Sequence, residues 1–220
     1  MSVDPAWKGV YKAGGVSLLI MGVLFFITLL SFAILQPPMT AEAALENPSV
    51  SWSYVPLTVG NVLFIPGVLA LYLALKEVNK NRMLIATGLA GVGIPLMLAD
   101  SILFFSLVTL SNGYMAATSE ALRAAYVAAA DLALGAALAF EGLAIILFNV
   151  STIIMSLVML KGIFSKGTAY LGIAAGIVGL VSTVWYVVPV LLIFMVVALI
   201  SMVLVAIWYL AVGYRLYKLG

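Results

Sequence analysis

The sequence predicts an all-α integral membrane protein, with six transmembrane helices in a single domain that covers residues 1–220. Composition, the lengths of the hydrophobic runs and the placement of basic residues lead to this prediction. The chain is 65% hydrophobic and 8% charged, with a mean hydropathy of +1.27. A soluble domain carries about 25% charged residues. A chain this apolar would expose too much hydrophobic surface in water, so we expect the lipid bilayer to be its main partner.

Six hydrophobic segments are long enough to cross the hydrocarbon core, which takes about 20 apolar residues in a helix. The segments are too long for the strands of a membrane barrel and do not alternate as such strands do. The first segment is also longer than the core of a signal peptide, so we expect it to be retained. The predicted spans are residues 10–36, 54–75, 83–110, 137–160, 168–188 and 190–213.

The basic residues predict the orientation of these spans. With six spans, only Arg123 falls on the side opposite to both termini, and the other Lys and Arg residues share one side. Because cytoplasmic loops carry an excess of Lys and Arg, both termini are expected in the cytoplasm, with the protein in the plasma membrane. The residues on the cytoplasmic side are Lys8, Lys12, Lys76, Lys80, Arg82, Lys161, Lys166, Arg215 and Lys218.

Two segments are predicted to lie on the outer side. Residues 36–53 contain Pro, Ala and Ser and are expected to form an external loop. The second segment begins after the third span with Ser111-Asn112-Gly113, a sequence typical of a turn.

An Ala-rich helix should follow that turn. It would open near Thr118 or Ser119, with Glu120 in its first turn. If it ran unbroken to the end of the fourth span, it would be about 60 Å long, twice the thickness of the bilayer core. The helix must therefore project from the membrane or bend near Gly135. We expect the bend, which would give a short outer amphipathic or re-entrant helix at residues 118–134.

Polar residues inside the spans are the candidate site. An ionisable side chain in a span costs about 2.5–3.5 kcal/mol on insertion scales and suggests a function. At helical rise, Asp100 and Glu141 lie about 24 and 28 Å above the inner ends of their spans, and Asn61 about 9 Å below an outer end. Ser182 and Thr183 reach a similar level. If these residues face inward together, they line an outward-opening acidic cavity for a small polar, cationic or amphipathic molecule, or for a proton.

Each of these residues also has a purely structural interpretation. Glu141 would be solvated if it lies at the interface. Asn61 would form a hydrogen bond between helices, worth about 0.6 kcal/mol on average. Arg123 is a candidate ion-pair partner for Asp100 or Glu141. Its alternative is a surface pair with Glu120, three residues earlier on the same helix.

Other polar and small residues are expected to serve helix packing. The fourth span carries a polar stripe, and Ser or Thr in such a stripe usually bonds back to its own helix. The small residues in "GGVSLLIMG" (14–22) and "GIAAGIVG" (172–179) are spaced for close helix contact. The residues of the polar stripe are Asn149, Ser151, Thr152 and Ser156.

The absence of His and Cys from the sequence removes several chemistries. It leaves no thiolate nucleophile, no Ser-His dyad and no Cys/His zinc site. An all-carboxylate metal site stays open in principle, whereas soft-metal chemistry does not. We identify no catalytic residue, no metal site and no cofactor in the sequence, and a net charge of +2 gives no reason to expect nucleic acid.

Three classes of function stay open from the sequence. The first is a binding or transport protein, in which Asp100 would carry a proton. The second is a structural or accessory membrane subunit, and the third is an intramembrane enzyme that uses two carboxylates on lipid or peptide. The sequence also leaves open whether the chain forms a homo-oligomer.

The region from the fourth to the fifth span resembles a known family. The matching segments are "FEGLAIILFNVSTIIMSLVML" and "LKGIFSKGTAYLGIAAGIVGLVS", with "LALYLALKEVNKNRMLIA" earlier in the chain. They resemble an uncharacterised prokaryotic family of six-helix membrane proteins, a domain-of-unknown-function family with a "YLGI"-type entry to the fifth helix. The resemblance implies the six-helix fold. It implies no activity, and this chain lacks the His that the family often places in its fourth helix.

Overall fold

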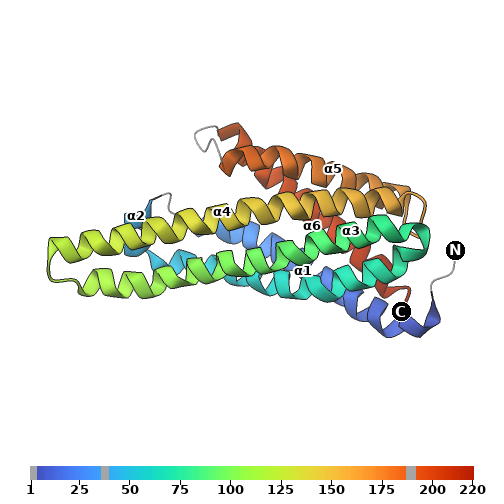
Figure 1. Ribbon diagram of the computed structural model, residues 1–220, viewed down its shortest axis with the longest axis horizontal. Coiled ribbons are helices and arrows are strands. Elements are labelled where there is room, and N and C mark those ends of the chain that lie inside the picture. The colour runs from blue at the N-terminus through green and yellow to red at the C-terminus, as the bar shows by residue number, and fades with distance from the viewer. Residues whose placement is uncertain (1–3, 36–39, 187–191) are drawn as a thin grey trace.

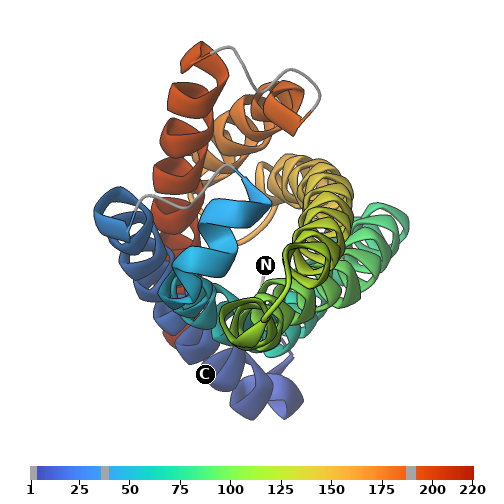
Figure 2. The same cartoon turned by 90° about the vertical axis from the view of Figure 1, so that its left-hand side faces the viewer.

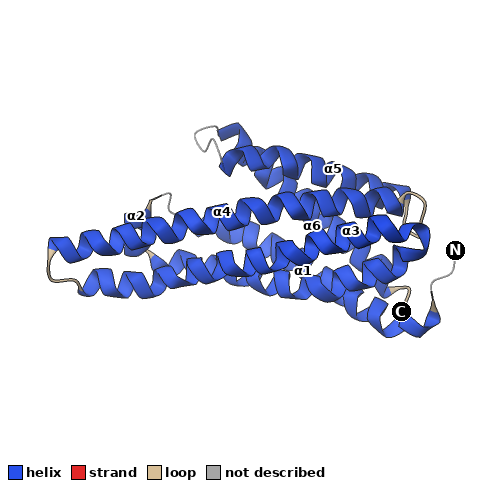
Figure 3. Cartoon of the chain, viewed as in Figure 1, coloured by secondary structure: helices blue, strands red, loops and turns tan. Residues whose placement is uncertain are grey.

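The computed structural model describes residues 4–35, 40–186 and 192–220, and every element in these ranges is helical (Figures 1 and 3). The all-α prediction is therefore confirmed for the described residues. The elements in chain order are η1 (Pro5–Trp7), α1 (Lys8–Leu35), α2 (Ala41–Glu46), η2 (Pro48–Tyr54), α3 (Val55–Ala116), α4 (Glu120–Met159), α5 (Lys166–Ser182), η3 (Thr183–Tyr186) and α6 (Leu192–Tyr217).

Four of the described helices, α1, α3, α4 and α6, are long and apolar enough to cross a membrane. Helix α5 is apolar but shorter, with 17 residues. Helix α1 also exposes a stripe of large apolar side chains at a spacing of three or four residues, which is the pattern of a helix face turned to lipid. The stripe consists of Val16, Ile20, Val23, Ile27, Leu30 and Ile34.

Helix α3 is two helices joined at a sharp reversal. Asn79 has an extended backbone, with φ −161° and ψ 91°. Its Oδ1 accepts a hydrogen bond from the backbone N of Arg82 at 3.0 Å, so the side chain caps the start of the second half. Figure 1 shows the two halves, residues 55–78 and 80–116, running back alongside each other. They contain the second and third predicted spans.

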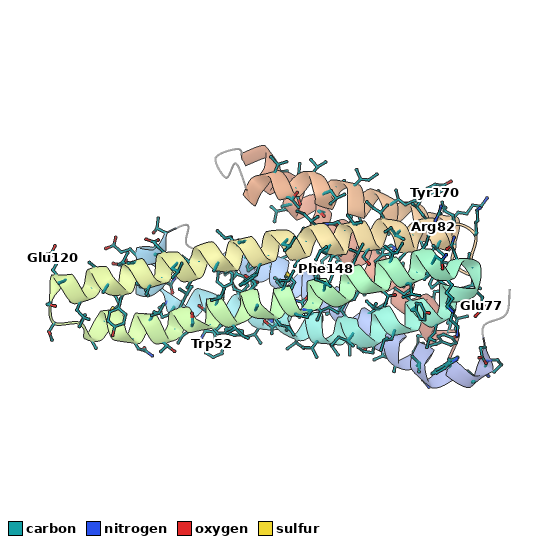
Figure 4. The ribbon with its side chains drawn as sticks, in the orientation of Figure 1. Trp52, Glu77, Arg82, Glu120, Phe148 and Tyr170 are labelled. Carbon is teal, nitrogen blue, oxygen red and sulfur yellow. The ribbon has the colours of Figure 1, made fainter. Side chains whose placement is uncertain are left out.

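The two ends of the bundle differ in their charge. We call the end that holds both termini the basic end (Figure 1). The reversal of α3 and the connection between α4 and α5 lie there as well, and Figure 4 shows Arg82 and Tyr170 at this end. All the Lys and Arg residues except Arg123 are close to one of these features in the chain. The opposite end holds Glu120 and the connection from α3 to α4, and we call it the hairpin end.

The predicted outer helix at residues 118–134 is wrong, because α4 is one continuous helix of 40 residues. Its start matches the sequence prediction: Ser119 Oγ accepts a hydrogen bond from the backbone N of Leu122 at 3.3 Å. Figure 1 shows the hairpin ends of α3 and α4 extending together past the other long helices. The helix projects instead of bending.

Packing against α3 explains why α4 stays unbroken. Ala130, Ala133 and Ala137 are buried in a cluster with Leu107 of α3. Gly135 lies on another side of the helix, and a Cβ at this position would meet nothing within 4 Å. A single glycine costs a helix only about 1 kcal/mol relative to alanine, so it does not impose a bend.

The predicted turn at residues 111–113 is also replaced by helix. Helix α3 continues to Ala116, and Gly113 makes room for the ring of Tyr126, whose Cε1 would lie 2.5 Å from a Cβ at this position. Gly113 therefore serves a close contact within the α3–α4 hairpin, and the chain turns only after Ala116.

The predicted external loop is partly helical, since it contains α2 (Ala41–Glu46) and most of η2 (Pro48–Tyr54); residues 36–39 lie outside the described part. Ala41, Ala44 and Leu45 of α2 are buried, and Ser111 of α3 donates a hydrogen bond to the carbonyl O of Leu45. Figure 2 shows α2 lying across the hairpin end of the bundle, where it contacts α3 and α4. This loop is therefore a packed cap.

Helices approach very closely at the basic end, as the small residues predict. A Cβ on Gly15 of α1 would lie 2.7 Å from the carbonyl O of Gly213 in α6. A Cβ on Gly172 of α5 would collide with Ser156 and Trp208. Gly15 meets the backbone of α6, and Gly172 meets side chains of α4 and α6, so neither position has room for a side chain and this end of the bundle is tightly packed.

Candidate functional site

A cavity of about 130 Å³ lies inside the bundle, between α1, both halves of α3, α4, α5 and α6. Six of its seventeen lining residues are polar, which is a high share for the interior of a membrane protein. The polar ones are Asn61, Glu141, Asn149, Thr152, Ser182 and Ser201; the others are Met21, Phe25, Phe32, Leu57, Met97, Ile145, Phe148, Ala198, Met202, Val205 and Tyr209.

The lining of α4 shows the shape of the cavity. The residues follow a helical spacing of 4, 3, 1 and 3, so they form one continuous face. The first and last of them are eleven helical steps apart, about 16 Å at helical rise, with Glu141 toward the hairpin end. The lining residues of this face are Glu141, Ile145, Phe148, Asn149 and Thr152. Figure 4 marks Phe148 near the middle of the bundle. The cavity is therefore elongated along the helices.

Three of the residues predicted from the sequence, Asn61, Glu141 and Ser182, line this cavity together. Asn61 is 2% exposed, and its Nδ2 has no hydrogen-bond partner among the described residues. Ser182 Oγ donates to the carbonyl O of Gly179 at 2.7 Å. Asn61 thus presents a hydrogen-bond donor that the protein itself does not use.

Asp100 is completely buried, one helical turn from the cavity. It lies on the same face of α3 as Met97, which lines the cavity, and Phe104, which stacks on Tyr54 with ring centroids 3.7 Å apart. Neither carboxylate oxygen of Asp100 has a hydrogen-bond partner among the described residues. The Asp100 carboxylate interacts electrostatically with Glu141, and both act on Tyr54. The two acids therefore share one region of the bundle.

Thr183 and Arg123 lie elsewhere. Thr183 Oγ1 donates to the carbonyl O of Leu180 at 2.6 Å, and the residue lines a separate groove on α4. The guanidinium carbon of Arg123 lies 6.0 Å from the ring centroid of Tyr114. Arg123 is eighteen residues from Glu141 on α4, about 27 Å at helical rise, which is beyond the reach of its side chain. The structure does not bring Arg123 to either carboxylate of the site.

The polar stripe of the fourth span divides between packing and the cavity. Ser151 donates to the carbonyl O of Ala86 at 2.8 Å and so joins α4 to α3. Asn149 and Thr152 line the cavity. Asn149 also serves packing as expected, because its Nδ2 donates to the carbonyl O of Ile145 at 2.8 Å and its side chain lies against Gly179 of α5. The positions of Asn149 and Thr152, eight and eleven residues after Glu141, place them on its helix face, which is the signal that would have identified them. Ser201 of α6 also lines the cavity. It lies in an apolar stretch of the sequence, so no pattern of polar residues around it could have identified it as a lining residue.

Aromatic rings form the walls of the cavity. Tyr209 contacts Phe25 and Phe64 nearly edge-on, with centroids 5.6 and 5.4 Å apart, and Phe64 contacts Phe148 at 5.5 Å. The rings come from α1, α3, α4 and α6, and three of them face the cavity. Edge-to-face contacts hold such rings in place. Among the described residues, no group of three or more His, Cys, Asp or Glu side chains is arranged to hold a metal ion.

Apolar helices of membrane-spanning length, packed around a cavity that has both polar and apolar lining residues, indicate an α-helical membrane protein. The model of one family, described as a domain of unknown function (DUF4386), matches residues 13–215, and the chain belongs to this family. The resemblance noted from the sequence is thereby confirmed. No curated protein and no solved structure matches the chain.

Proposed function

We propose that this protein binds a small polar, cationic or amphipathic molecule in its cavity and carries it across the plasma membrane. Six segments then span the bilayer: α1, the two halves of α3, α4, α5 and α6. The reversal of α3 at Asn79 and the placement of both termini at one end support an even number of spans. The concentration of basic residues at that end supports a cytoplasmic location for it.

One observation carries this proposal: Asn61, Glu141 and Ser182 from three helices line one cavity, with Asp100 a turn away. Burying a polar group without a hydrogen bond costs about 1–3 kcal/mol in proteins. A bundle selected only for packing would carry apolar residues at these positions. Asn61 Nδ2 has no hydrogen-bond partner among the described residues, and a ligand that pairs with it best explains why this amide is buried on the cavity wall.

Asp100 is proposed as the residue that couples transport to protons. Its oxygens are buried, and an isolated carboxylate ion in such a place is strongly unfavourable. The Lys and Arg residues of the chain lie near the ends of the helices, away from this position. The charge of Asp100 must then be neutralised by a proton or by a cation that enters the cavity. This requirement would couple the binding of a proton to the binding of a cationic ligand.

Uptake into proteoliposomes tests this proposal. A panel of small polar, cationic and amphipathic solutes would be screened with the wild-type protein, and the transported solute then measured with Asp100→Asn. We expect a loss of about tenfold or more, equivalent to about 1.4 kcal/mol. Glu120→Gln removes an acid from α4 at the hairpin end and should leave uptake unchanged. Equal uptake by Asp100→Asn and wild type would exclude the proton-carrying role, and no uptake of any solute by wild type would exclude transport.

The projecting α3–α4 hairpin favours a second candidate function, that of an accessory subunit. Met115 and Leu132 on this hairpin are 68% and 76% exposed, which is typical of a contact surface or of contact with lipid. A partner that co-purifies at fixed stoichiometry with wild type, and is lost with Leu132→Glu, would support this role. Co-purification that is insensitive to this substitution would count against it.

A further inference from the structure

We infer that the cavity is built for a small organic ammonium ion that also carries an oxygen acceptor. This inference rests on the proposed function, because it names the ligand class of the same cavity. Glu141 supplies the counter-charge, the aromatic walls receive the alkyl groups, and Asn61 donates a hydrogen bond to the oxygen of the ligand.

The charge of the site selects a cation. Among the lining residues that the structure describes, Glu141 is the one charged side chain. Asp100 lies behind the cavity wall and interacts electrostatically with Glu141. The basic residues of the chain lie toward the helix ends, so the field in the cavity comes mainly from carboxylates and favours a positive ligand.

The walls select an organic cation over a hydrated metal ion. Phe25, Phe32, Phe148 and Tyr209 all line the cavity, and the three lining methionines add polarisable, adaptable surface. Aromatic rings attract ammonium ions through their faces and bind quaternary ammonium groups well. A metal cation such as Ca²⁺ instead takes six to eight oxygen ligands around one point. The oxygen-bearing side chains of this cavity are spread along it, with Glu141 and Thr152 about 16 Å apart on α4, and Glu141 is the one carboxylate among the described lining residues. The cation should therefore carry its own apolar groups.

Size and hydrogen bonding narrow the ligand further. The volume of about 130 Å³ is close to that of an engineered cavity of about 150 Å³ that holds benzene, so the ligand has only a few non-hydrogen atoms. Asn61 Nδ2 is buried on the cavity wall without a partner. An oxygen acceptor on the ligand would satisfy it. A hydroxyalkyl ammonium ion combines these features.

Choline and its uncharged analogue 3,3-dimethylbutan-1-ol provide a matched pair of probes. They share the hydroxyl group and the overall shape, and they differ in the nitrogen and its charge. Binding would be measured by titration calorimetry on the full chain in nanodiscs. We expect choline to bind about tenfold or more tightly than the analogue, because a desolvated cation–π contact adds to the attraction of Glu141.

Variants of α4 assign this preference to the site. Glu141→Gln should narrow the difference between the probes to about threefold or less, whereas Glu120→Gln should keep it. Glu141→Asp retains the charge and should retain the preference for choline over its analogue. If Glu141→Gln fails to fold, Glu141→Asp tests the role of the charge in its place. An unchanged preference in folded Glu141→Gln would overturn the assignment of Glu141.

The remaining outcomes separate this inference from the proposed function. Equal binding of choline and its analogue to wild type overturns the inference and leaves a small-molecule cavity in place. Displacement of choline by sodium or potassium chloride at equal concentration also overturns it, because the site would then prefer an inorganic cation. If wild type binds neither probe, the inference fails, and the uptake screen with other solutes decides the proposed function separately.

Discussion

The helices pack closely at one end of the bundle and enclose a cavity toward the other. At the basic end, glycines allow backbones to touch, as Gly15 does against Gly213, and Trp208 is completely buried. Toward the hairpin end, the helices enclose a cavity, and the polar groups of Asn61 and Asp100 are buried without partners. Close packing stabilises the first region. Unpartnered polar atoms occur in both regions, since Tyr11 Oη and Trp208 Nε1 toward the basic end also have no partner among the described residues. The second region differs in its open volume and its buried carboxylate, which lower stability and are expected where function competes with stability.

The largest effect should come from filling a close helix contact at the basic end. Gly15→Val places side-chain atoms against the backbone of α6 and should lower the free energy of unfolding by about 3 kcal/mol. Gly91→Val is the control, because a Cβ there meets nothing within 4 Å. Unfolding of both variants in mixed detergent–SDS micelles measures the difference. Equal losses would contradict the close α1–α6 contact.

A substitution near the cavity should instead raise the free energy of unfolding. Asp100→Leu keeps the branching of the side chain and removes two unpaired oxygens, so it should raise the free energy of unfolding by about 1–3 kcal/mol. The same variant should lose uptake. Ser101→Ala is the control, since Ser101 Oγ only donates to Met97 O of its own helix. A loss of stability in Asp100→Leu would reveal a stabilising partner and would weaken the contrast between the two ends.

A smaller effect should follow from loosening the cap at the hairpin end. Ser111→Ala removes the hydrogen bond to Leu45 and should cost about 1 kcal/mol. Hydrogen exchange should then become faster in α2. Ser106→Ala removes a bond to Leu103 within the same helix, at 2.7 Å, and should leave exchange in α2 unchanged. Equal exchange in both variants would show that other contacts hold α2.

The sequence predicted best what depends on composition and local chemistry. The apolar helices follow from hydropathy, the start of α4 follows from Ser119 as a cap, and the reversal near Asn79 falls in the polar segment between the second and third spans. The depth of Asn61 and Glu141 was sufficient to place them near one another, but the rotation of each helix was not known. Packing between the helices sets that rotation, so the sequence alone does not distinguish Asp100, which lies behind the cavity wall, from the residues that line the cavity.

The errors at the hairpin end share one physical cause. Gly113 and Gly135 both suggested breaks, because glycine weakens a helix and favours turns. In the structure, contacts between α3 and α4 outweigh this weak local preference. The loop before α3 was mistaken for the same reason, since Leu45 is buried by a contact with a helix some sixty residues away. Long-range packing of this kind cannot be predicted from a local pattern.

The smallest predicted effect tests the projecting form of α4 directly. If α4 is straight through Gly135, as the structure has it, Gly135→Ala should raise the free energy of unfolding by about 0.5–1 kcal/mol, because alanine is the better helix former. Gly113→Ala should lower it, since a Cβ there meets the ring of Tyr126. Thermal unfolding of the two variants in nanodiscs measures both signs. A loss of stability in Gly135→Ala would mean that this position needs the freedom of glycine, and it would favour a bent α4 that lies on the membrane surface.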